Sequence, residues 1–458
     1  MPKRQAIPDQ VLVAVIAVWA VLYLTRGLAA HYALETNAYD LSLFDYAIWS
    51  LAHGGRGHVP FIGQSIFSQH FMPILGAIVP VYAVAPSPVT LIVLQVLAVA
   101  AAAWVYFRLQ QRVALDVRLA IPLTIAFLFA RRTHGATTSF FYPEAFQPLL
   151  TFACVLLWLE GRWKAYWTCA IALLMTKEDA AVYLAAFAVL TAWRQRERRR
   201  HAAWTAGFCV AWIVIALLVV IPRSRAADGL PSTNPFLADR FAASPGGELQ
   251  MGALIDRASS LKTISTLVNL MAAVGFLPFA AAEWLVPAIP GIAVNLLARP
   301  DSMQASLIGH YFFAVMPWLF VAATYGLAHV HRRGPRVAVA WCGVFVIATL
   351  ADSPAFRRLP LAAFYIEAQT AKQQLEQIRG DVLLVQPNLV PHLPHQRGIY
   401  TLGEGSAPPR PADMVAMTRI GDLWPFTIAE WNQRLEEFRK NAEYDEVLSG
   451  PVILFKRR

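Results

Sequence analysis

Two aspartates in the segment AYDLSLFDYAIWSLAHGG, residues 38–55, are the first candidates for chemistry in this sequence. The segment reads as a short helix that two glycines end. At about 100° per residue, Asp45 falls beside the arc that Leu41, Phe44 and Ile48 occupy, on the apolar side of the helix. A carboxylate facing lipid from this side would cost about 2.5–3.5 kcal/mol or more. We therefore expect Asp45 to face a polar cavity or a partner side chain.

Each aspartate of this segment allows a structural and a catalytic interpretation. Asp40 precedes the helix, where its side chain could cap the first turn. Asp45 could form a structural ion pair, for example with Arg26 or Arg56. Alternatively, either carboxylate could act as a general base or a polar ligand at the mouth of a cavity.

A second group of polar residues lies in RRTHGATTSFFYPEAFQP, residues 131–148. It contains Arg131, Arg132, His134, Tyr142 and Glu144. Two adjacent arginines beside a membrane suit an anionic lipid headgroup or a phosphate. They could instead anchor a helix end at the membrane interface.

A third group is the run of charges in MTKEDAAVY, residues 175–183. Lys177, Glu178 and Asp179 lie between two short apolar runs, where they could form a solvated turn. The functional alternative is that Lys177 binds a phosphate while Glu178 or Asp179 orients a substrate hydroxyl.

A fourth group lies in ARPDSMQASLIGHYFF, residues 298–313, and contains Arg299, Asp301, His310 and Tyr311. Histidines and arginines at helix ends are commonly structural, so this group also allows both interpretations. The histidines of the first loop, which include His70, have no zinc-motif spacing. Support for a metal site is therefore weak, although the acidic groups leave room for a divalent cation.

Long apolar runs determine the fold class. The chain is 57% hydrophobic and 15% charged, which is too apolar for a soluble protein of its 458 residues. The runs VLVAVIAVWAVLYLTRGLAA (11–30) and LIVLQVLAVAAAAWVYF (91–107) are each long enough to cross a bilayer. We predict an all-α polytopic membrane protein with about eleven transmembrane helices. The predicted spans are residues 11–30, 88–107, 119–130, 145–160, 165–176, 179–193, 203–221, 264–282, 283–298, 310–330 and 337–351.

The distribution of Lys and Arg predicts the orientation in the membrane. The net charge is +10, but the basic residues cluster between apolar runs, which argues against nucleic-acid binding. With the N-terminus in the cytoplasm, the basic runs RQRERRR (194–200) and HRRGPR (331–336) lie inside, as the positive-inside rule requires. This choice makes the proline-broken segment 71–86 re-entrant or interfacial rather than a full span. We therefore predict a multi-pass protein of the cell inner membrane, with all four polar groups on the outer side.

Three outer regions are then large: the first loop (31–87), residues 222–263, and the C-terminal tail after about residue 352. In the tail, DVLLVQP (381–387), GIYTL (398–402), YDEVLSG (444–450) and PVILFKR (451–457) read as strands. IAEWNQRLEEFRKNA (428–442) reads as an amphipathic helix. We predict a transmembrane domain over 1–351 and a small extracytoplasmic α/β domain over 352–458.

An ordered series of motifs resembles a known family. YDLSLFDYAIW, QHFMPILGAIVPVY, FYPEAF, TKEDAA, GHYFF and VPHLPHQRGIYTL occur in this order. Together they resemble the bacterial and archaeal membrane family known as domain of unknown function 2079, over nearly the whole chain. The family pattern typically has a histidine where this chain has Tyr142, which puts activity in doubt if that histidine is required.

The resemblance implies a function, because that family is similar in architecture to the GT-C glycosyltransferases. This link is an analogy at the level of the fold. It implies a polyprenyl-phosphate-linked sugar as donor at the outer face, and a catalytic acid in the first outer loop. Asp45, or else Asp40, would then act on the acceptor hydroxyl.

The expected ligands of the donor follow from this interpretation. Arg131, Arg132, Lys177 and His310 would hold the lipid-linked phosphate. Substrate contacts would come from His70, Tyr142, Glu144, Glu178, Asp179 and Tyr311. The expected partners are the polyprenyl-phosphate lipid and membrane lipids, and no cofactor is required beyond the divalent cation allowed for above. The alternatives are a transporter or flippase of a lipid-linked or anionic solute, which intramembrane charges also suit, and a non-catalytic membrane scaffold.

Overall fold

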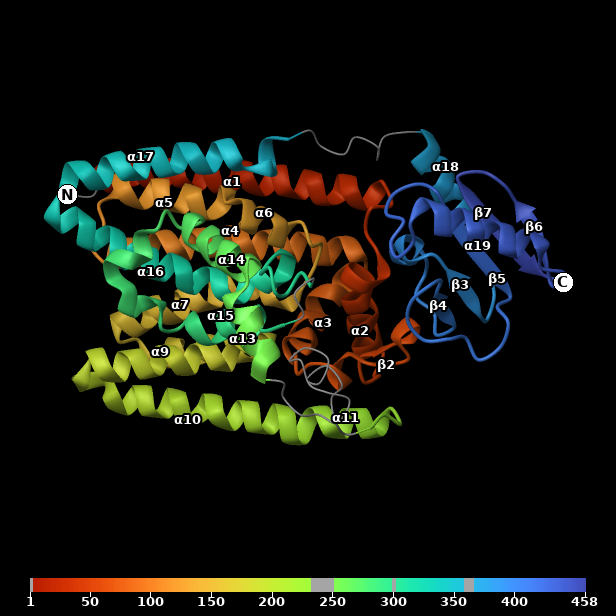
Figure 1. Ribbon diagram of the computed structural model, residues 1–458, viewed down its shortest axis with the longest axis horizontal. Helices are drawn as coiled ribbons and strands as arrows, with labels where there is room; N and C mark the ends of the chain where they lie inside the picture. The colour runs from red at the N-terminus through yellow and green to blue at the C-terminus, as the bar shows by residue number, and fades with distance from the viewer. Residues whose placement is uncertain (1–2, 232–250, 299–301, 358–365) are drawn as a thin grey trace.

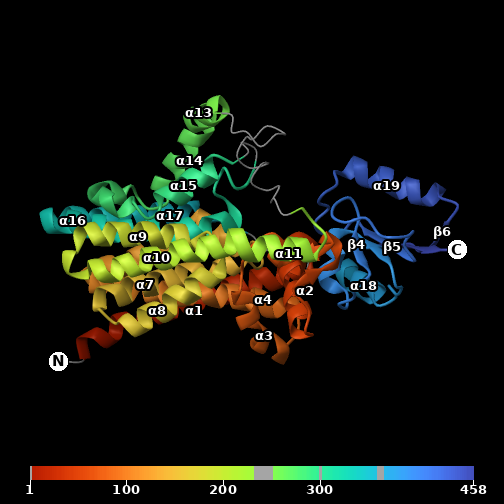
Figure 2. The same ribbon diagram turned by 90° about the horizontal axis from the view of Figure 1, so that it is seen from below.

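A computed structural model describes residues 3–231, 251–298, 302–357 and 366–458. It shows a helical bundle with a smaller unit of helices and strands at one end (Figure 1). The N-terminus lies at the opposite end of the bundle (Figures 1 and 2). Helices α2 (Leu43–Ala52) and α3 (Ile74–Val84), from the first loop, lie at the same end as the smaller unit. The first loop and the C-terminal tail, both predicted to be outside, therefore share one end of the molecule.

The prediction of a largely helical, multi-pass membrane protein is confirmed, but the count of spans is lower than expected. Among the described residues, five helices are long and apolar enough to cross a membrane. A sixth span results if the pair Leu261–Ala272 and Leu277–Leu285, bent by 107°, is counted as one. The five are Asp9–Tyr32, Pro88–Arg112, Arg196–Ala227, Gly309–Arg333 and Pro335–Asp352.

The other predicted spans correspond to shorter or broken helices. A helix of 13 to 15 residues, such as α5, α7, α8 or α9, covers only about 20 Å, less than the roughly 30 Å of a hydrocarbon core. The bundle helices are α1 (Lys3–Tyr32), α4 (Pro88–Arg112), α5 (Val117–Phe129), α6 (Arg131–Thr137), α7 (Gln147–Glu160), α8 (Trp163–Thr176), α9 (Ala180–Arg194), α10 (Arg199–Ile215), α11 (Ile221–Ala227), α13 (Met251–Ser259), α14 (Leu261–Ala272), α15 (Ile289–Leu296), α16 (Phe312–Arg333) and α17 (Pro335–Asp352).

The region predicted as spans 264–282 and 283–298 does not form two regular helices. Gly275 has a φ of 60°, and Pro278 follows it at the start of a 3₁₀ segment, η7 (Leu277–Leu285). Ala281 departs from helical geometry inside that segment. A positive φ and a proline both interrupt the hydrogen-bond ladder of an α-helix, which explains the break.

The first loop contains short elements only. α3 has 11 residues and includes Pro80, so it covers about 16 Å and is too short to cross a bilayer. This length agrees with the interfacial or re-entrant interpretation of segment 71–86. A two-stranded hairpin, β1 (His58–Val59) and β2 (Gln64–Ser65), lies between α2 and α3.

The C-terminal unit is built on a mixed five-stranded sheet with the order β4-β3-β5-β7-β6. The contacts of β3 with β4 and β5 are parallel, whereas β7 pairs with β5 and β6 in antiparallel fashion. The sequence predicted four of these strands and helix α19, but it did not predict β5 or α18. All five side chains of β5 are buried, so it lacks the alternating pattern of a half-exposed strand. The elements are α18 (Ile366–Leu375), β3 (Leu383–Val385), β4 (Ile399–Thr401), β5 (Met414–Thr418), α19 (Ile428–Lys440), β6 (Tyr444–Leu448) and β7 (Val452–Arg457).

One hydrophobic core joins the first loop to the C-terminal sheet. It contains Leu41, Phe44 and Ile48 from the first loop, together with Val385 and Leu454 from β3 and β7. A separate core on the sheet packs around Trp431 of α19. The shared core fixes the loop that carries the candidate aspartates against the C-terminal unit.

Candidate active site

Asp40 lies in a π-helical turn, η1 (Ala38–Ser42), at the start of the first loop. The side chain of Asn37 caps this turn by accepting hydrogen bonds from the backbone N–H groups of Tyr39 and Asp40, at 2.9 and 3.2 Å. Because Asn37 is the cap, the carboxylate of Asp40 is left for other contacts. It accepts a hydrogen bond of 2.5 Å from the hydroxyl of Tyr142. Burial raises the pKa of Asp40 despite this hydrogen bond, which makes it a stronger base than an exposed aspartate.

Tyr142 connects Asp40 to the fourth polar group. Its ring stacks on that of His310, with the centroids 3.6 Å apart and the planes 12° from parallel. The ring of Tyr311 lies 4.1 Å from that of His310. The backbone N–H of Tyr142 donates to the side chain of Gln95 on α4 at 2.8 Å. Tyr142 is therefore buried, and both its hydroxyl and its backbone N–H are hydrogen-bonded.

Glu144 and Lys177 form a buried ion pair. Lys177 Nζ lies 2.7 Å from Glu144 Oε1, and the two side chains are only 10% and 4% exposed. Burial opposes both charges, but their mutual attraction keeps the pKa of Glu144 below its ordinary value and that of Lys177 above it. The second oxygen of Glu144 is buried and has no hydrogen-bond partner among the described residues.

Glu178 forms a second, neighbouring pair with His70 of the first loop. His70 Nδ1 lies 2.7 Å from Glu178 Oε1, and the backbone N–H of Phe71 donates to Oε2 at 2.8 Å. Burial raises the pKa of Glu178, but His70 and Lys177 outweigh this effect and lower it to about 2. Asp179 follows directly at the start of α9, and within the described parts of the chain its Oδ1 is buried without a partner.

The structure thus brings together nine of the twelve residues to which the sequence analysis gave a catalytic, phosphate-binding or substrate-binding role. They come from five segments that are separated in the chain but adjacent in space. The nine residues are Asp40, His70, Tyr142, Glu144, Lys177, Glu178, Asp179, His310 and Tyr311. We call this group the acidic network.

Asp45 lies apart from these contacts, in a buried cluster that faces the C-terminal unit. Its side chain is 2% exposed. One oxygen accepts a 2.5 Å hydrogen bond from the hydroxyl of Tyr82 on α3, and the other lies 2.6 Å from Nε2 of His395. Trp49 stacks on His395 with an interplanar angle of 6°. The partner of Asp45 in the structure is His395, rather than Arg26 or Arg56, which the sequence offered as examples.

The two arginines predicted to bind phosphate are engaged within the protein. Arg131 forms a two-pronged ion pair with Asp352, at 2.8 and 2.5 Å. Arg132 donates to the backbone carbonyls of residues 306 and 307. Two further residues of the fourth polar group, Arg299 and Asp301, lie outside the described residues.

Several residues with contacts to these sites were not predicted. His395 lies in the motif VPHLPHQRGIYTL, which carried the family resemblance but gave no hint of a partner in the first loop. Gln95 is a polar residue inside an apolar run, and a polar residue at such a position signals a buried contact. Asn37 directly precedes the segment with which the sequence analysis began, and Asn is a favoured capping residue.

The family described as "Predicted membrane protein (DUF2079)" matches residues 30–420. The chain belongs to this family. No curated protein matches the sequence. Among solved structures, the chain is similar to ArnT from Cupriavidus metallidurans bound to undecaprenyl phosphate, with a TM-score of 0.59 and 13% identity, over 98% of this chain and 97% of that one. It is also similar to the arabinofuranosyltransferase AftD from Mycobacteria, with a TM-score of 0.52 and 13% identity. That match covers 96% of this chain but only 40% of AftD. At these identities the likeness concerns the fold.

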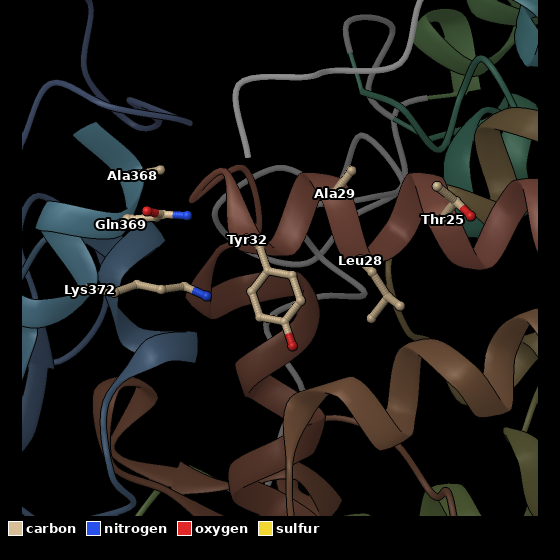
Figure 3. A pocket seen from close by; sticks show the side chains of 7 residues that line it. All are labelled: Thr25, Leu28, Ala29, Tyr32, Ala368, Gln369 and Lys372. Carbon is tan, nitrogen blue, oxygen red and sulfur yellow. The ribbon is translucent and has the colours of Figure 1, made fainter. Parts of the chain in front are cut away.

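Two cavities in the described part of the DUF2079 chain lie at the end that carries the first loop and the C-terminal unit. The larger, of about 450 Å³, lies between α1 and α18 and is lined mainly by apolar groups (Figure 3). Its charged lining residue is Lys372, whose ammonium lies 3.6 Å from the centre of the Tyr32 ring. The smaller, of about 190 Å³, is lined by residues of α1, α4 and α6, including Arg26 and His134.

No group of three or more His, Cys, Asp or Glu side chains in the described parts of this DUF2079 protein has the arrangement of a metal site. Glu144 and Asp179 each keep an oxygen without a hydrogen bond among those residues. These oxygens are the atoms that a divalent cation or a substrate hydroxyl could engage.

Proposed function

We propose that this chain is an integral-membrane glycosyltransferase that takes a sugar from a polyprenyl-phosphate carrier outside the membrane. The observation that carries the proposal is the acidic network, which contains the carboxylate of Asp40. It lies within a fold similar to that of ArnT. The ArnT structure holds undecaprenyl phosphate, which supports the same class of carrier here.

Asp40 is the group that we assign as general base, in preference to Asp45. Asp40 is partly exposed, whereas both oxygens of Asp45 are already bonded to Tyr82 and His395. The acceptor hydroxyl attacks the anomeric carbon of the sugar and passes its proton to the carboxylate of Asp40. The bond between that carbon and the phosphate oxygen breaks, its electron pair stays on the phosphate, and the configuration at the carbon inverts. A base with a pKa raised by burial is better suited to this proton transfer.

Other members of the acidic network position the substrate in this proposal. Tyr142 orients the carboxylate of Asp40 by donating a hydrogen bond to it. The unpartnered oxygens of Glu144 and Asp179 accept hydrogen bonds from sugar hydroxyls or hold a divalent cation. Lys177, held by Glu144, supplies positive charge that favours the phosphate leaving group.

The orientation in the membrane is part of the proposal. The first loop and the C-terminal unit lie outside, the N-terminus lies in the cytoplasm, and the shorter helices α5, α7, α8 and α9 complete the multi-pass bundle. Support comes from the placement of both predicted outer regions at one end of the molecule, opposite the N-terminus.

The test compares three variants of the purified protein in nanodiscs, with a polyprenyl-phosphate-linked sugar and a panel of acceptors. Asp40→Asn is expected to lower the transfer rate by about 10²- to 10⁴-fold, the usual contribution of a general base. Asp445→Asn makes the same chemical change at an exposed carboxylate of β6 and serves as the matched control. Asp45→Asn tests the other aspartate.

Each result has a defined meaning. Loss of transfer in Asp40→Asn, with an intact fold and an active Asp445→Asn protein, supports the assignment. Loss in a folded Asp45→Asn protein, with Asp40→Asn fully active, moves the base to Asp45. If the wild type transfers no sugar but moves the lipid across a bilayer, the protein is a flippase. If it does neither, the scaffold interpretation replaces the enzyme.

A further inference from the structure

The smaller cavity contains a buried cation with an unused hydrogen-bond donor. Arg26 on α1 is 8% exposed and lines this cavity. Its Nη2 donates to the backbone carbonyls of Pro354 and Ala355, at 3.1 and 2.8 Å. Its Nε–H is buried and has no partner among the described residues. A buried charged donor without an acceptor is costly, so the arrangement favours a further acceptor at this position.

His134 adds a second polar group to the cavity wall. Its Nδ1 lies 2.9 Å from the hydroxyl of Tyr23, so when Tyr23 donates, Nε2 carries the proton and can donate in turn. Burial, together with the positive charges of Arg26, Arg357 and Arg131, lowers the pKa of His134 to about 4. The imidazole is therefore neutral near pH 7, and the charge around it is positive.

Glu35 also lines the cavity and carries the opposite charge. Burial and the nearby carboxylate of Asp422 raise the pKa of Glu35, so its carboxyl group is less readily ionised than an exposed one. With a volume of about 190 Å³, the cavity is smaller than the roughly 300–1,000 Å³ of sites for drug-sized ligands. It is suited to a single polar headgroup, and it lies in the last turns of α1, at the end of a predicted span.

We propose that this cavity binds a phosphoryl group, with Arg26 supplying positive charge and His134 a neutral donor from the cavity wall. The inference rests on the proposed function, because the phosphoryl group would be that of the lipid carrier. Gln95 links the cavity to the acidic network: its Nε2 donates to the carbonyl of Thr137 at 2.8 Å, and its Oε1 accepts from Tyr142. A phosphoryl group bound here therefore lies one side chain away from the tyrosine that contacts Asp40.

The larger cavity provides the internal control. Lys372 of α18 also places a positive charge beside the end of α1, but its ammonium lies over the ring of Tyr32. The same lipid could be drawn to either positive charge, so substitution of each cation distinguishes the two cavities.

The experiment measures the affinity of the full chain for undecaprenyl phosphate in phosphatidylcholine nanodiscs, with no acceptor present. Inorganic phosphate is added in a second series as a competitor. The variants are Arg26→Gln, His134→Phe and Lys372→Gln. His134→Phe keeps a ring against Tyr23 but removes the donor and leaves Arg26 in place. Arg26→Gln also loses the hydrogen bonds to the carbonyls of residues 354 and 355, so it could fail to fold. In that case His134→Phe alone tests whether the cavity binds the lipid phosphate.

We expect Arg26→Gln to weaken lipid binding at least tenfold, since a charge-assisted hydrogen bond to phosphate is lost. His134→Phe should weaken it several-fold, and Lys372→Gln should leave it unchanged. Competition by inorganic phosphate would show that the cavity recognises the phosphoryl group from either source. Binding without such competition would assign it to the lipid headgroup.

Two results would overturn the inference: wild-type affinity in both cavity variants, or loss of affinity in Lys372→Gln alone. Because binding is measured without turnover, a failure of sugar transfer would leave this result untouched and would count only against the proposed function.

Discussion

The buried contact between Asp45 and His395 makes a strong prediction about how the C-terminal unit is held. Asp45 belongs to α2 of the first loop and His395 to the tail, 350 residues later in the chain. We expect His395→Ala to loosen this contact without unfolding the helical bundle, because the pair lies at the boundary of the two regions. Opening should expose α2 and residues 387–402.

The size of the expected destabilisation follows from the burial and the charge of the two side chains. When His395 is protonated, loss of one partner of this buried pair costs about 3–5 kcal/mol. The lower limit applies here because the His395 side chain is 15% exposed. In an Asp45→Asn background the remaining hydrogen bond is neutral, and its loss costs about 1 kcal/mol. The difference predicts a coupling energy of about 2 kcal/mol between the two positions. The stacking of His395 on Trp49 is lost in both backgrounds and cancels from this difference.

The assay is native-state hydrogen exchange on the wild type, the two single variants and the double variant, at one pH. Exchange rates of amides in α2 give the free energy of local opening for each protein. Amides of α16 (Phe312–Arg333), deep in the bundle, serve as the control and should not change. Additive effects of the two substitutions, with a coupling below about 0.5 kcal/mol, would show that the pair does not hold the unit in place.

Three further predictions concern buried charges and one glycine. Lys177→Met should destabilise the protein by about 3–5 kcal/mol in thermal unfolding, because Glu144 is left buried and unpaired; adding Glu144→Leu should recover most of the loss. The pKa of Glu178 is about 2 when folded against about 4.3 when unfolded, so its stabilising effect is present above pH 4.3 and is lost as the pH falls towards 2. The melting temperatures of wild type and Glu178→Gln should therefore converge in that window; a constant gap would contradict the reasoning. Gly421→Ala should speed proteolysis of the tail, since φ is +78° and the new Cβ would lie 2.1 Å from a carbonyl oxygen at the end of α1. Unchanged cleavage would show that this contact is dispensable.

The polar residues of the candidate site could be selected from the sequence, because charge is rare in apolar segments. Lys177, Glu178 and Asp179 are conspicuous between two apolar runs. The pairing of Glu178 with His70, however, joins residues 108 positions apart. Such a contact depends on how helices pack, and helix packing leaves no periodic trace in the sequence.

The two aspartates of the first loop also separate what the sequence can predict from what only the tertiary structure can show. The periodicity of α2 correctly placed Asp45 on the buried face of its helix. It could not show that the tail covers that face, nor that Asn37 caps the preceding turn and frees Asp40. For this reason the sequence put Asp45 before Asp40, and the tertiary structure reverses the order in our proposal.

The sequence by itself determined the class of the protein: a multi-pass helical membrane chain with a C-terminal unit of helices and strands. Hydropathy and local periodicity are properties of neighbouring residues, so they can be read along the chain. Only the tertiary structure decided which polar residues meet, that Arg131 and Arg132 bind within the protein, and that Arg26 lines a cavity with an unused donor. These outcomes depend on contacts between distant segments, which packing of the whole molecule fixes.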